Sequence, residues 1–293
     1  MRDTFIGLGL AAIASCCFAA ATIIQAIEAR GVALRHALRA SLLTSLAQRR
    51  RWLAGVLLGL CAAGLQLAAL SYAPVTVVQP ADAAGLLVVL VAGARLLHEP
   101  IRAWHVAAAA AIVAGVTAIA LADIAHADTH AGLAGLGPAL VLTALVGASP
   151  FLLRRWTGSP PWLTAVGAGV AFALSSFALR LVADALGAGD VAGVVLFAAV
   201  AGGGALLGLG SEMSAVQSRP IASVAPVIFA VELLVPIVLA RLVGHEHWPG
   251  HAGREALLTA GMLLTLGGAT ALLRAPVVAT VLRAEHAADT GDG

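Results

Sequence analysis

Long apolar runs, separated by short polar stretches, recur along the whole 293-residue chain. A helix that crosses a bilayer needs about 20 mainly apolar residues, and a series of runs reaches about that length. These runs cover roughly residues 4–27, 52–73, 75–97, 103–122, 131–153, 162–183, 190–213, 221–243 and 254–274. The pattern therefore predicts an all-α membrane protein.

A further segment, residues 32–48, is less apolar than these runs. Its leucines recur at helical spacing, but Arg35, His36 and Arg39 interrupt them. Such a segment is either a short span or an amphipathic helix that lies on the membrane surface. We therefore expect about ten spanning helices, or nine if residues 32–48 do not span.

The amino-acid composition supports a membrane protein and indicates which membrane contains it. The chain is 60% hydrophobic and 11% charged, with a mean hydropathy of +0.97, whereas soluble domains are about 45–50% apolar and about 25% charged. The net charge of +2 is spread over short clusters, so we expect the lipid bilayer and no nucleic acid as a partner. Lysine and asparagine are absent, which indicates GC-rich codon usage and a bacterial cytoplasmic (inner) membrane.

An internal repeat links residues 69–99 with residues 215–246. Pro74 and Pro80 of the first copy match Pro220 and Pro226 of the second at an offset of 146 positions. Both copies also contain an Ala-Arg-Leu triplet followed by a His-Glu pair. A repeat of this kind indicates two related structural units.

The placement of arginines predicts the orientation of these units. Arginine-rich loops face the cytoplasm, and arginines cluster in residues 30–51, 95–102, 154–155 and 274–283. We therefore expect a cytoplasmic C-terminus. The first copy should run from the outside of the membrane to the cytoplasm, and the second copy should run from the cytoplasm to the outside. Inverted repeats are typical of secondary transporters. We predict a first repeat over residues 1–125, a second over 126–278 and a cytoplasmic tail over 279–293.

Two acidic residues lie deep inside predicted spans. Asp82 is about 12 Å from Pro74, and Glu232 is about 17 Å from Ile221, at 1.5 Å per residue. An acid at that depth costs about 2.5–3.5 kcal/mol on insertion scales and usually marks a functional site. No arginine lies at mid-depth to neutralise either acid, so binding of a proton or a cation is the natural role.

The alternative for these acids is a structural carboxyl that stays protonated and hydrogen-bonds to a neighbouring helix. Gln66, Gln25 and Gln79 are the candidate partners. Pro80 and Pro226 also lie inside spans, where each removes a backbone donor and frees a carbonyl group. These prolines serve either as simple kinks or as interruptions beside the site.

Three other features carry weaker signals. Gly204 and Gly208 form a GxxxG pair, which we expect to serve packing within the chain, with a homodimer as the alternative. Histidines and acids gather in residues 123–130 and 245–251, where we expect solvated loops more than a metal site. Glu99 is expected only to end its helix. No G-x-S-x-G, HExxH or Walker motif is present, so we expect no enzyme and no cofactor.

With the inverted repeat, the Val78-Gln79-Pro80 triplet and the Leu-x-x-Glu motif of residues 96–99, the chain resembles the drug/metabolite transporter superfamily and its EamA-like members. The resemblance implies two inverted five-helix halves, with residues 32–48 as a degenerate second span. Where such families often show Gly-Glu after the fourth helix, this chain has His98-Glu99.

The first half is most similar to the branch that contains NIPA-like magnesium transporters. The shared features are Gln25 near the end of the first helix, the Trp-Leu-Ala-Gly that opens at Trp52, and residues 67–79 leading into Pro80. The leading hypothesis is a secondary transporter of a small metabolite or cationic drug, coupled to protons. A divalent-cation (magnesium) transporter is the alternative within transport, and a non-transporting membrane subunit is the alternative outside it. The predicted substrate or coupling-ion site comprises Asp82, Glu232, Gln79, Pro80, Gln66, Gln25 and Pro226.

Overall fold

The fold is built from long apolar helices. The computed structural model describes residues 2–73, 75–99, 101–122, 133–157, 160–243 and 252–274. Over these residues, nine helices are long and apolar enough to cross a membrane. They are α1 (Arg2–Arg30), α3 (Arg50–Tyr72), α4 (Val75–Leu96), α5 (Ala103–Leu121), α6 (Leu133–Thr157), α7 (Pro161–Gly187), α8 (Val191–Val216), α9 (Ile221–Val243) and α10 (Ala252–Leu273). The predicted all-α membrane fold is confirmed.

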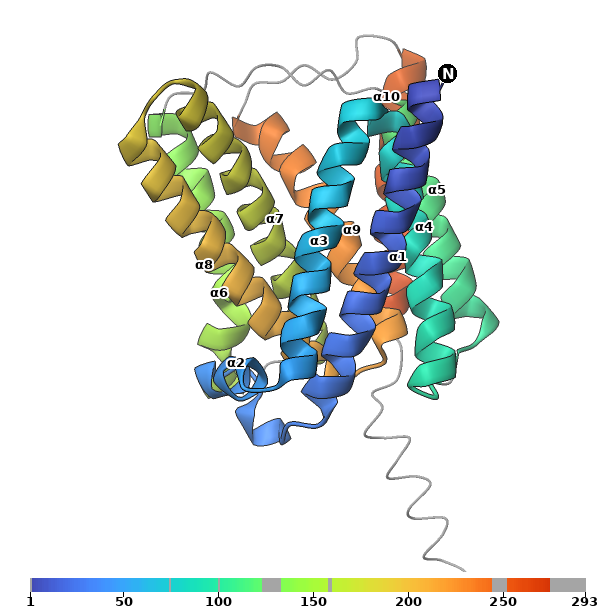
Figure 1. Cartoon of the computed structure of the whole chain (residues 1–293), viewed down its shortest axis with the longest axis vertical. Coiled ribbons are helices and arrows are strands. Elements are labelled where there is room, and N and C mark those ends of the chain that lie inside the picture. Colours follow the sequence, from blue (N-terminus) through green and yellow to red (C-terminus); the bar gives the residue numbers. More distant parts are fainter. Residues whose placement is uncertain are drawn as a thin grey trace, which may run out of the picture.

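The ambiguous segment of residues 32–48 does not span. It forms a 3-10 turn, η1 (Leu34–His36), and the short helix α2 (Ala40–Ala47) across one end of the molecule (Figure 1). Eight residues of α-helix extend about 12 Å, well short of the hydrocarbon core. The expectation of a degenerate second span is therefore wrong, and the nine-helix alternative describes this part of the chain. The two arginines and the histidine shorten the apolar run, while Leu42 and Leu46 are fully buried in the core.

The repeat seen in the sequence has a counterpart in the helices. The first residues of α4 and α9, Val75 and Ile221, are 146 positions apart, and the two helices run in opposite directions (Figure 1). In the first half α1 packs against α3 and α4, and in the second α7 packs against α8 and α9. The inverted arrangement thus holds for four helix pairs, with α6 as an additional helix of the second half. The boundary between residues 125 and 126 stays a prediction, and the tail of residues 279–293 lies outside the described residues.

Glycines bring the two halves together along α5 and α10. A Cβ atom on Gly115 of α5 would lie 2.6 Å from the Gly261 carbonyl oxygen of α10. A Cβ atom on Gly268 of α10 would likewise lie 2.5 Å from the Ala108 carbonyl oxygen of α5. Only glycine permits backbones to approach this closely, so the α5–α10 contact depends on these positions.

The GxxxG pair of α8 serves the same purpose within the second half. A Cβ atom on Gly204 would lie 2.9 Å from the Ala171 carbonyl oxygen, and one on Gly208 would lie 2.7 Å from the Phe172 ring. Both neighbours belong to α7. The expected internal packing is confirmed, and a homodimer stays a prediction.

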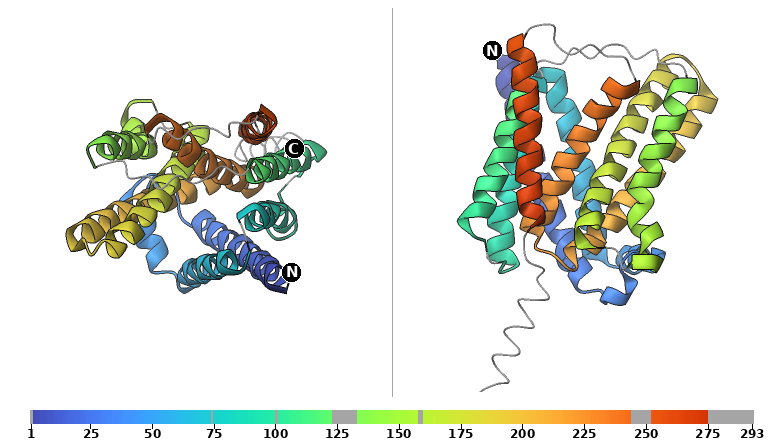
Figure 2. Two further views of the ribbon diagram at one scale, coloured as in Figure 1. Left: turned by 90° about the horizontal axis from the view of Figure 1, so that it is seen from above. Right: turned by 180° about the vertical axis from the view of Figure 1, so that it is seen from behind.

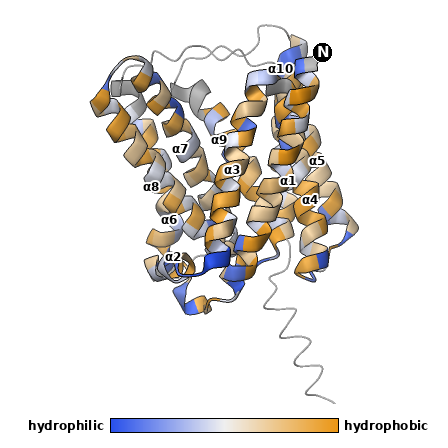
Figure 3. Cartoon of the chain, in the orientation of Figure 1, coloured by the Kyte–Doolittle hydropathy of each residue, from blue (hydrophilic) through white to orange (hydrophobic). Residues whose placement is uncertain are grey.

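The surface of the bundle matches a lipid environment. Large apolar side chains are exposed on the outer helix faces, including Leu60, Leu67 and Val195, and the hydrophilic colours gather toward the ends of the helices (Figure 3). A band of exposed apolar surface of this kind is what lipid covers. We call the end that holds α2 the arginine-rich end, because Arg30, Arg39, Arg49, Arg50, Arg51, Arg95, Arg102 and Arg219 lie there.

Helices α6, α7 and α8 are not parallel to α1, α5 and α10 (Figures 1 and 2). The group α6, α7 and α8 meets α1 and α3 at the arginine-rich end, and it leans away from α1, α5 and α10 toward the opposite end (Figures 1 and 2). The long helices therefore converge at one side of the membrane.

Candidate functional site

Asp82 is held by a glutamine on the neighbouring helix. It lies in α4, two residues after Pro80, and its Oδ2 accepts a hydrogen bond from Gln66 Nε2 of α3 at 2.5 Å. In the described part of the chain, its Oδ1 is buried and has no hydrogen-bond partner. Gln79 lies one turn away on the same helix and is half-buried. The structure thus joins Asp82 with Gln66 and leaves one carboxyl oxygen available.

Helix α1 fixes the backbone beside this carboxyl. Ser15 Oγ donates to the carbonyl oxygens of Ala81 at 3.1 Å and Asp82 at 3.0 Å. Gly85 makes room for this contact, since a Cβ atom there would collide with Ser15 Oγ. Ser15 and Gly85 were not among the predicted site residues, because the sequence does not show which face of α1 meets α4.

Gln25 does not join this group. It is buried between α1 and α3, where a Cβ atom on Gly55 would lie 2.9 Å from its Cγ. Gln25 is five residues from the arginine-rich end of its helix, whereas Asp82 is fourteen residues from the corresponding end of α4. At 1.5 Å per residue the two differ by about 13 Å in depth. Of the candidate partners, the structure therefore joins Gln66 and not Gln25 to Asp82, and a role of Gln25 in the substrate or coupling-ion site stays a prediction.

Glu232 has its own partner within the second half. It lies in α9, and its Oε1 accepts a hydrogen bond from Ser176 Oγ of α7 at 3.0 Å. Glu232 is half-buried, and Pro226, six residues earlier in α9, is buried. Pro226 therefore lies inside α9 without sharing an exposed surface with the acid.

A third carboxyl, Glu212 of α8, lies inside a span and was missed from the sequence. It is half-buried, four residues before the end of α8 at Val216, and its carboxyl interacts electrostatically with that of Glu232. The predicted span ended at residue 213, which placed Glu212 at a membrane boundary. Following the apolar run to Val216 would have revealed it.

The acids of the two halves are not equivalent in the repeat. The position matching Asp82 in the second copy is Ile228, and the position matching Glu232 in the first is Leu86. Each acid is bonded to helices of its own half. A shallow open hollow on α10, lined by Ala252, Glu255 and nearby residues to Leu263, contains none of these acids.

The span acids differ from the acids at the arginine-rich end in the charge of their partners. Asp82 and Glu232 accept hydrogen bonds from an amide and a hydroxyl. Glu28 is paired with Arg49 at 3.0 Å, and Glu99 is paired with Arg30. Neutral partners leave the charge of a span carboxyl uncompensated, which favours a bound proton or cation.

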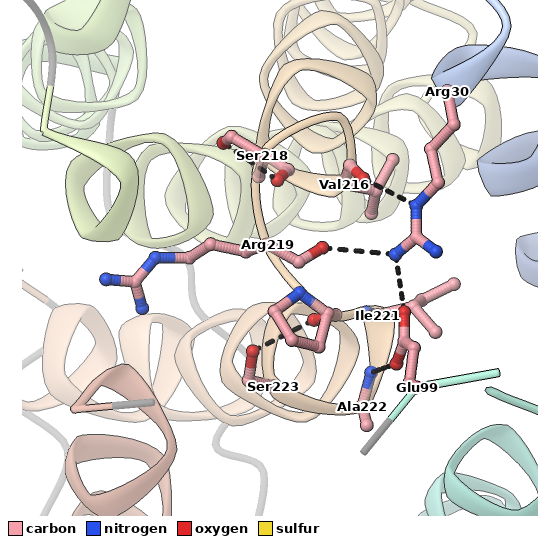
Figure 4. A network of polar contacts seen from close by, with 10 residues as sticks. Arg30, Glu99, Val216, Ser218, Arg219, Ile221, Ala222 and Ser223 are labelled. Atoms are coloured by element: carbon pink, nitrogen blue, oxygen red, sulfur yellow. Dashed lines mark hydrogen bonds and ion pairs between the residues drawn. The ribbon is translucent and has the colours of Figure 1, made fainter. Parts of the chain in front are cut away.

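Glu99 does more than end its helix, which corrects the expectation above. Its side chain is 3% exposed and pairs with Arg30 of α1 (Figure 4). Its two oxygens also accept hydrogen bonds from the backbone N–H groups of Ile221 at 2.8 Å and Ala222 at 3.2 Å, which open α9. A carboxylate satisfies the free donors of a helix start and complements its partial positive charge.

The backbone of the turn after α4 places the Glu99 carboxylate at the start of α9. His98 has a φ of 52°, and the amides of Leu97 and Glu99 both donate to the Gly93 carbonyl oxygen. A positive φ favours glycine, which is the residue that the resembling families show at this position. A Cβ atom on Gly93 would lie 3.1 Å from both Glu99 Oε2 and Ile221 Cγ2, so Gly93 makes the contact between α4 and α9 possible.

Arg219 extends the network to α10. Its Nη1 donates to the Leu273 carbonyl oxygen at 2.7 Å, at the end of α10. Burial lowers the pKa of the Arg219 guanidinium, because desolvation disfavours the charged form. The turn of residues 217–220 therefore contacts the ends of two helices outside its own hairpin, α1 and α10.

The histidine-rich loops at residues 123–130 and 245–251 lie outside the described residues. Among the residues that the structure does describe, no three His, Cys, Asp or Glu side chains form a group that could hold a metal ion.

No protein-family model, curated protein or solved structure matches this chain. The fold itself defines the class, a multi-pass α-helical membrane protein. The resemblance to the drug/metabolite transporter superfamily stays a prediction.

Proposed function

We propose that the protein is a secondary transporter of the bacterial cytoplasmic membrane, related to the drug/metabolite transporters, that moves a small metabolite or cationic drug in exchange for protons. One observation carries the proposal. Carboxyl groups lie within the spans of two inverted sets of helices, and Asp82 and Glu232 have neutral hydrogen-bond partners. Transporters place their substrate and ion sites near the midplane between such repeats.

The geometry of Asp82 suits reversible proton binding. Gln66 donates to one oxygen, while the other oxygen is buried without a partner in the described part of the chain. A carboxyl removed from water binds a proton more readily than one in water. The free oxygen accepts that proton, and the Gln66 hydrogen bond holds the side chain in place in both forms.

The second half offers a complementary arrangement. Glu212 and Glu232 repel one another when both are ionised, so together they favour binding a proton or a cation. Ser176 donates to Glu232 and holds its orientation. A cationic substrate that displaces the proton would neutralise the same carboxylates. The carboxylates then carry either protons or substrate, so the substrate moves in the direction opposite to the protons.

Among the described residues, no observation supports the alternatives of a magnesium transporter or a non-transporting membrane subunit. A magnesium site calls for oxygen ligands in octahedral geometry, and no three His, Cys, Asp or Glu side chains in the described part of the chain form a group that could hold a metal ion. A docking arm of a membrane subunit would need a free amphipathic segment, whereas Leu42 and Leu46 bury α2 against this chain.

The proposal is tested with purified protein in sealed proteoliposomes that contain a pH-sensitive dye. After a pH gradient is imposed, small cations and amphiphilic amines are added one at a time. Transport coupled to protons predicts that at least one solute dissipates the gradient faster than in protein-free vesicles. A panel of cations, amines and neutral metabolites that leaves the gradient unchanged would contradict it.

A further inference from the structure

Oppositely charged side chains of the first half clamp the α8–α9 hairpin of the second. Arg30 donates to the carbonyl oxygens of Val216 at 3.0 Å and Arg219 at 3.2 Å, where α8 ends (Figure 4). Glu99 accepts from the N–H groups that begin α9. A cation thus lies at a helix C-terminus, an anion at a helix N-terminus, and the two pair with one another.

The clamp is reciprocal. Gln217, in the α8–α9 turn, donates from Nε2 to the carbonyl oxygens of Ala29 and Val32, both at 3.0 Å. Ala29 lies in the last turn of α1, and Val32 follows the end of that helix. Each half therefore satisfies the helix ends of the other half, and the contact needs both halves in place.

The same end carries a second link. The Leu38 N–H donates to Ser214 Oγ at 2.9 Å, and its carbonyl oxygen accepts from Arg154 Nη1 at 3.1 Å. Leu38 has a φ of 53°, a conformation that a bulky residue keeps only when its surroundings enforce it. The hydrogen bonds described here between the halves all lie at the arginine-rich end.

We propose that Arg30, Glu99 and Gln217 form a gate that closes the arginine-rich end, and that this structure is the state closed at that end. The helices meet there and lean apart toward the opposite end (Figures 1 and 2). Access at the arginine-rich end requires the α8–α9 turn to leave α1 and the α4 turn. That movement breaks the three sets of caps together.

A nearby ion pair provides the matched control. Arg49 and Glu28 lie at the same end and pair at 3.0 Å, but the hydrogen bonds described for them stay within the first half. A movement between the halves breaks the hydrogen bonds that Arg30 and Glu99 make to the α8–α9 hairpin and leaves the Arg49–Glu28 pair intact. Removing the charge of Glu28 should therefore leave the gate unchanged.

Ala215 serves as the reporter of the closed gate. It is 0% exposed and lies next to the last residue of α8. In a full-length variant whose three cysteines are replaced by alanine, Ala215→Cys is treated with a membrane-impermeant maleimide, added in turn to each side of sealed vesicles. Glu99→Gln should raise the labelling rate at least tenfold from one side only, whereas Glu28→Gln should not change it.

Arg30→Gln should open the same gate from the other side of the ion pair. It should raise labelling as Glu99→Gln does, and the double variant should add little, because both remove one shared interaction. Gel filtration in detergent identifies variants that fail to fold. Equal labelling in folded Glu99→Gln, Arg30→Gln and Glu28→Gln proteins would overturn the gate. The assay needs no substrate, so the gate and the proposed transport activity fail independently.

Discussion

The contact between α5 and α10 allows a quantitative prediction about Gly115. A Cβ atom at this position would lie 2.6 Å from the Gly261 carbonyl oxygen and 2.7 Å from the Thr265 nitrogen. Carbon and oxygen atoms that are not bonded approach to about 3.3 Å, so Gly115→Ala forces the helices apart by about 0.7 Å. Both neighbours are backbone atoms of a helix, which cannot rotate away. We expect a loss of stability of about 1–3 kcal/mol, typical of an overpacked core.

The matched control is Gly267→Ala on α10, where a Cβ atom would meet nothing within 4 Å. Alanine favours a helix by about 1 kcal/mol relative to glycine, so this variant should be as stable as the parent or more so. Thermal unfolding of both purified variants in the same detergent, followed by circular dichroism, measures the difference. Equal unfolding temperatures for the two variants would show that α5 and α10 do not pack as closely as described.

Three further predictions concern the arginine-rich end and the topology. Glu99→Gln should lower the unfolding temperature more than Glu28→Gln, because it removes a buried carboxylate that neutralises Arg30 and caps the start of α9; equal effects would contradict this role of Glu99. His98→Gly should stabilise the protein by about 1 kcal/mol in chemical unfolding, since glycine adopts a positive φ without strain; a loss of stability would refute the strained turn. Single cysteines within 98–102 and within 185–189 should be labelled from opposite sides of the membrane, and labelling from one side would exclude the topology.

The helices were predictable from the sequence because their signal is local. An apolar run of about 20 residues marks a span on its own, and the prolines at positions 80 and 226 align the two copies of the repeat. Residues 32–48 were ambiguous, since the leucine spacing indicates a helix but does not say whether it crosses the bilayer. The short length of α2 decides the question, and the burial of Leu42 and Leu46 that accompanies it depends on tertiary packing.

The candidate site was predictable only in part. Depth along a span singled out Asp82 and Glu232, but not their partners, because the sequence does not show which helix faces meet. The structure selects Gln66 and Ser176 as those partners. In the sequence, Glu99 was expected only to end its helix. Its pairing with Arg30 joins residues 69 positions apart, and no spacing pattern in the sequence indicates such a contact.

Neutralising the span acids tests the central claim most directly. Asp82→Asn and Glu232→Gln keep the shape and hydrogen bonding of the side chains but cannot ionise. Glu255→Gln, an exposed acid in the first turn of α10, is the control. Proton movement driven by the best solute is then compared in proteoliposomes that contain equal amounts of folded protein. We expect Asp82→Asn and Glu232→Gln to abolish this movement and Glu255→Gln to retain it. Normal rates and normal pH dependence in both span variants would show that these carboxyls are structural and that the coupling assignment is wrong.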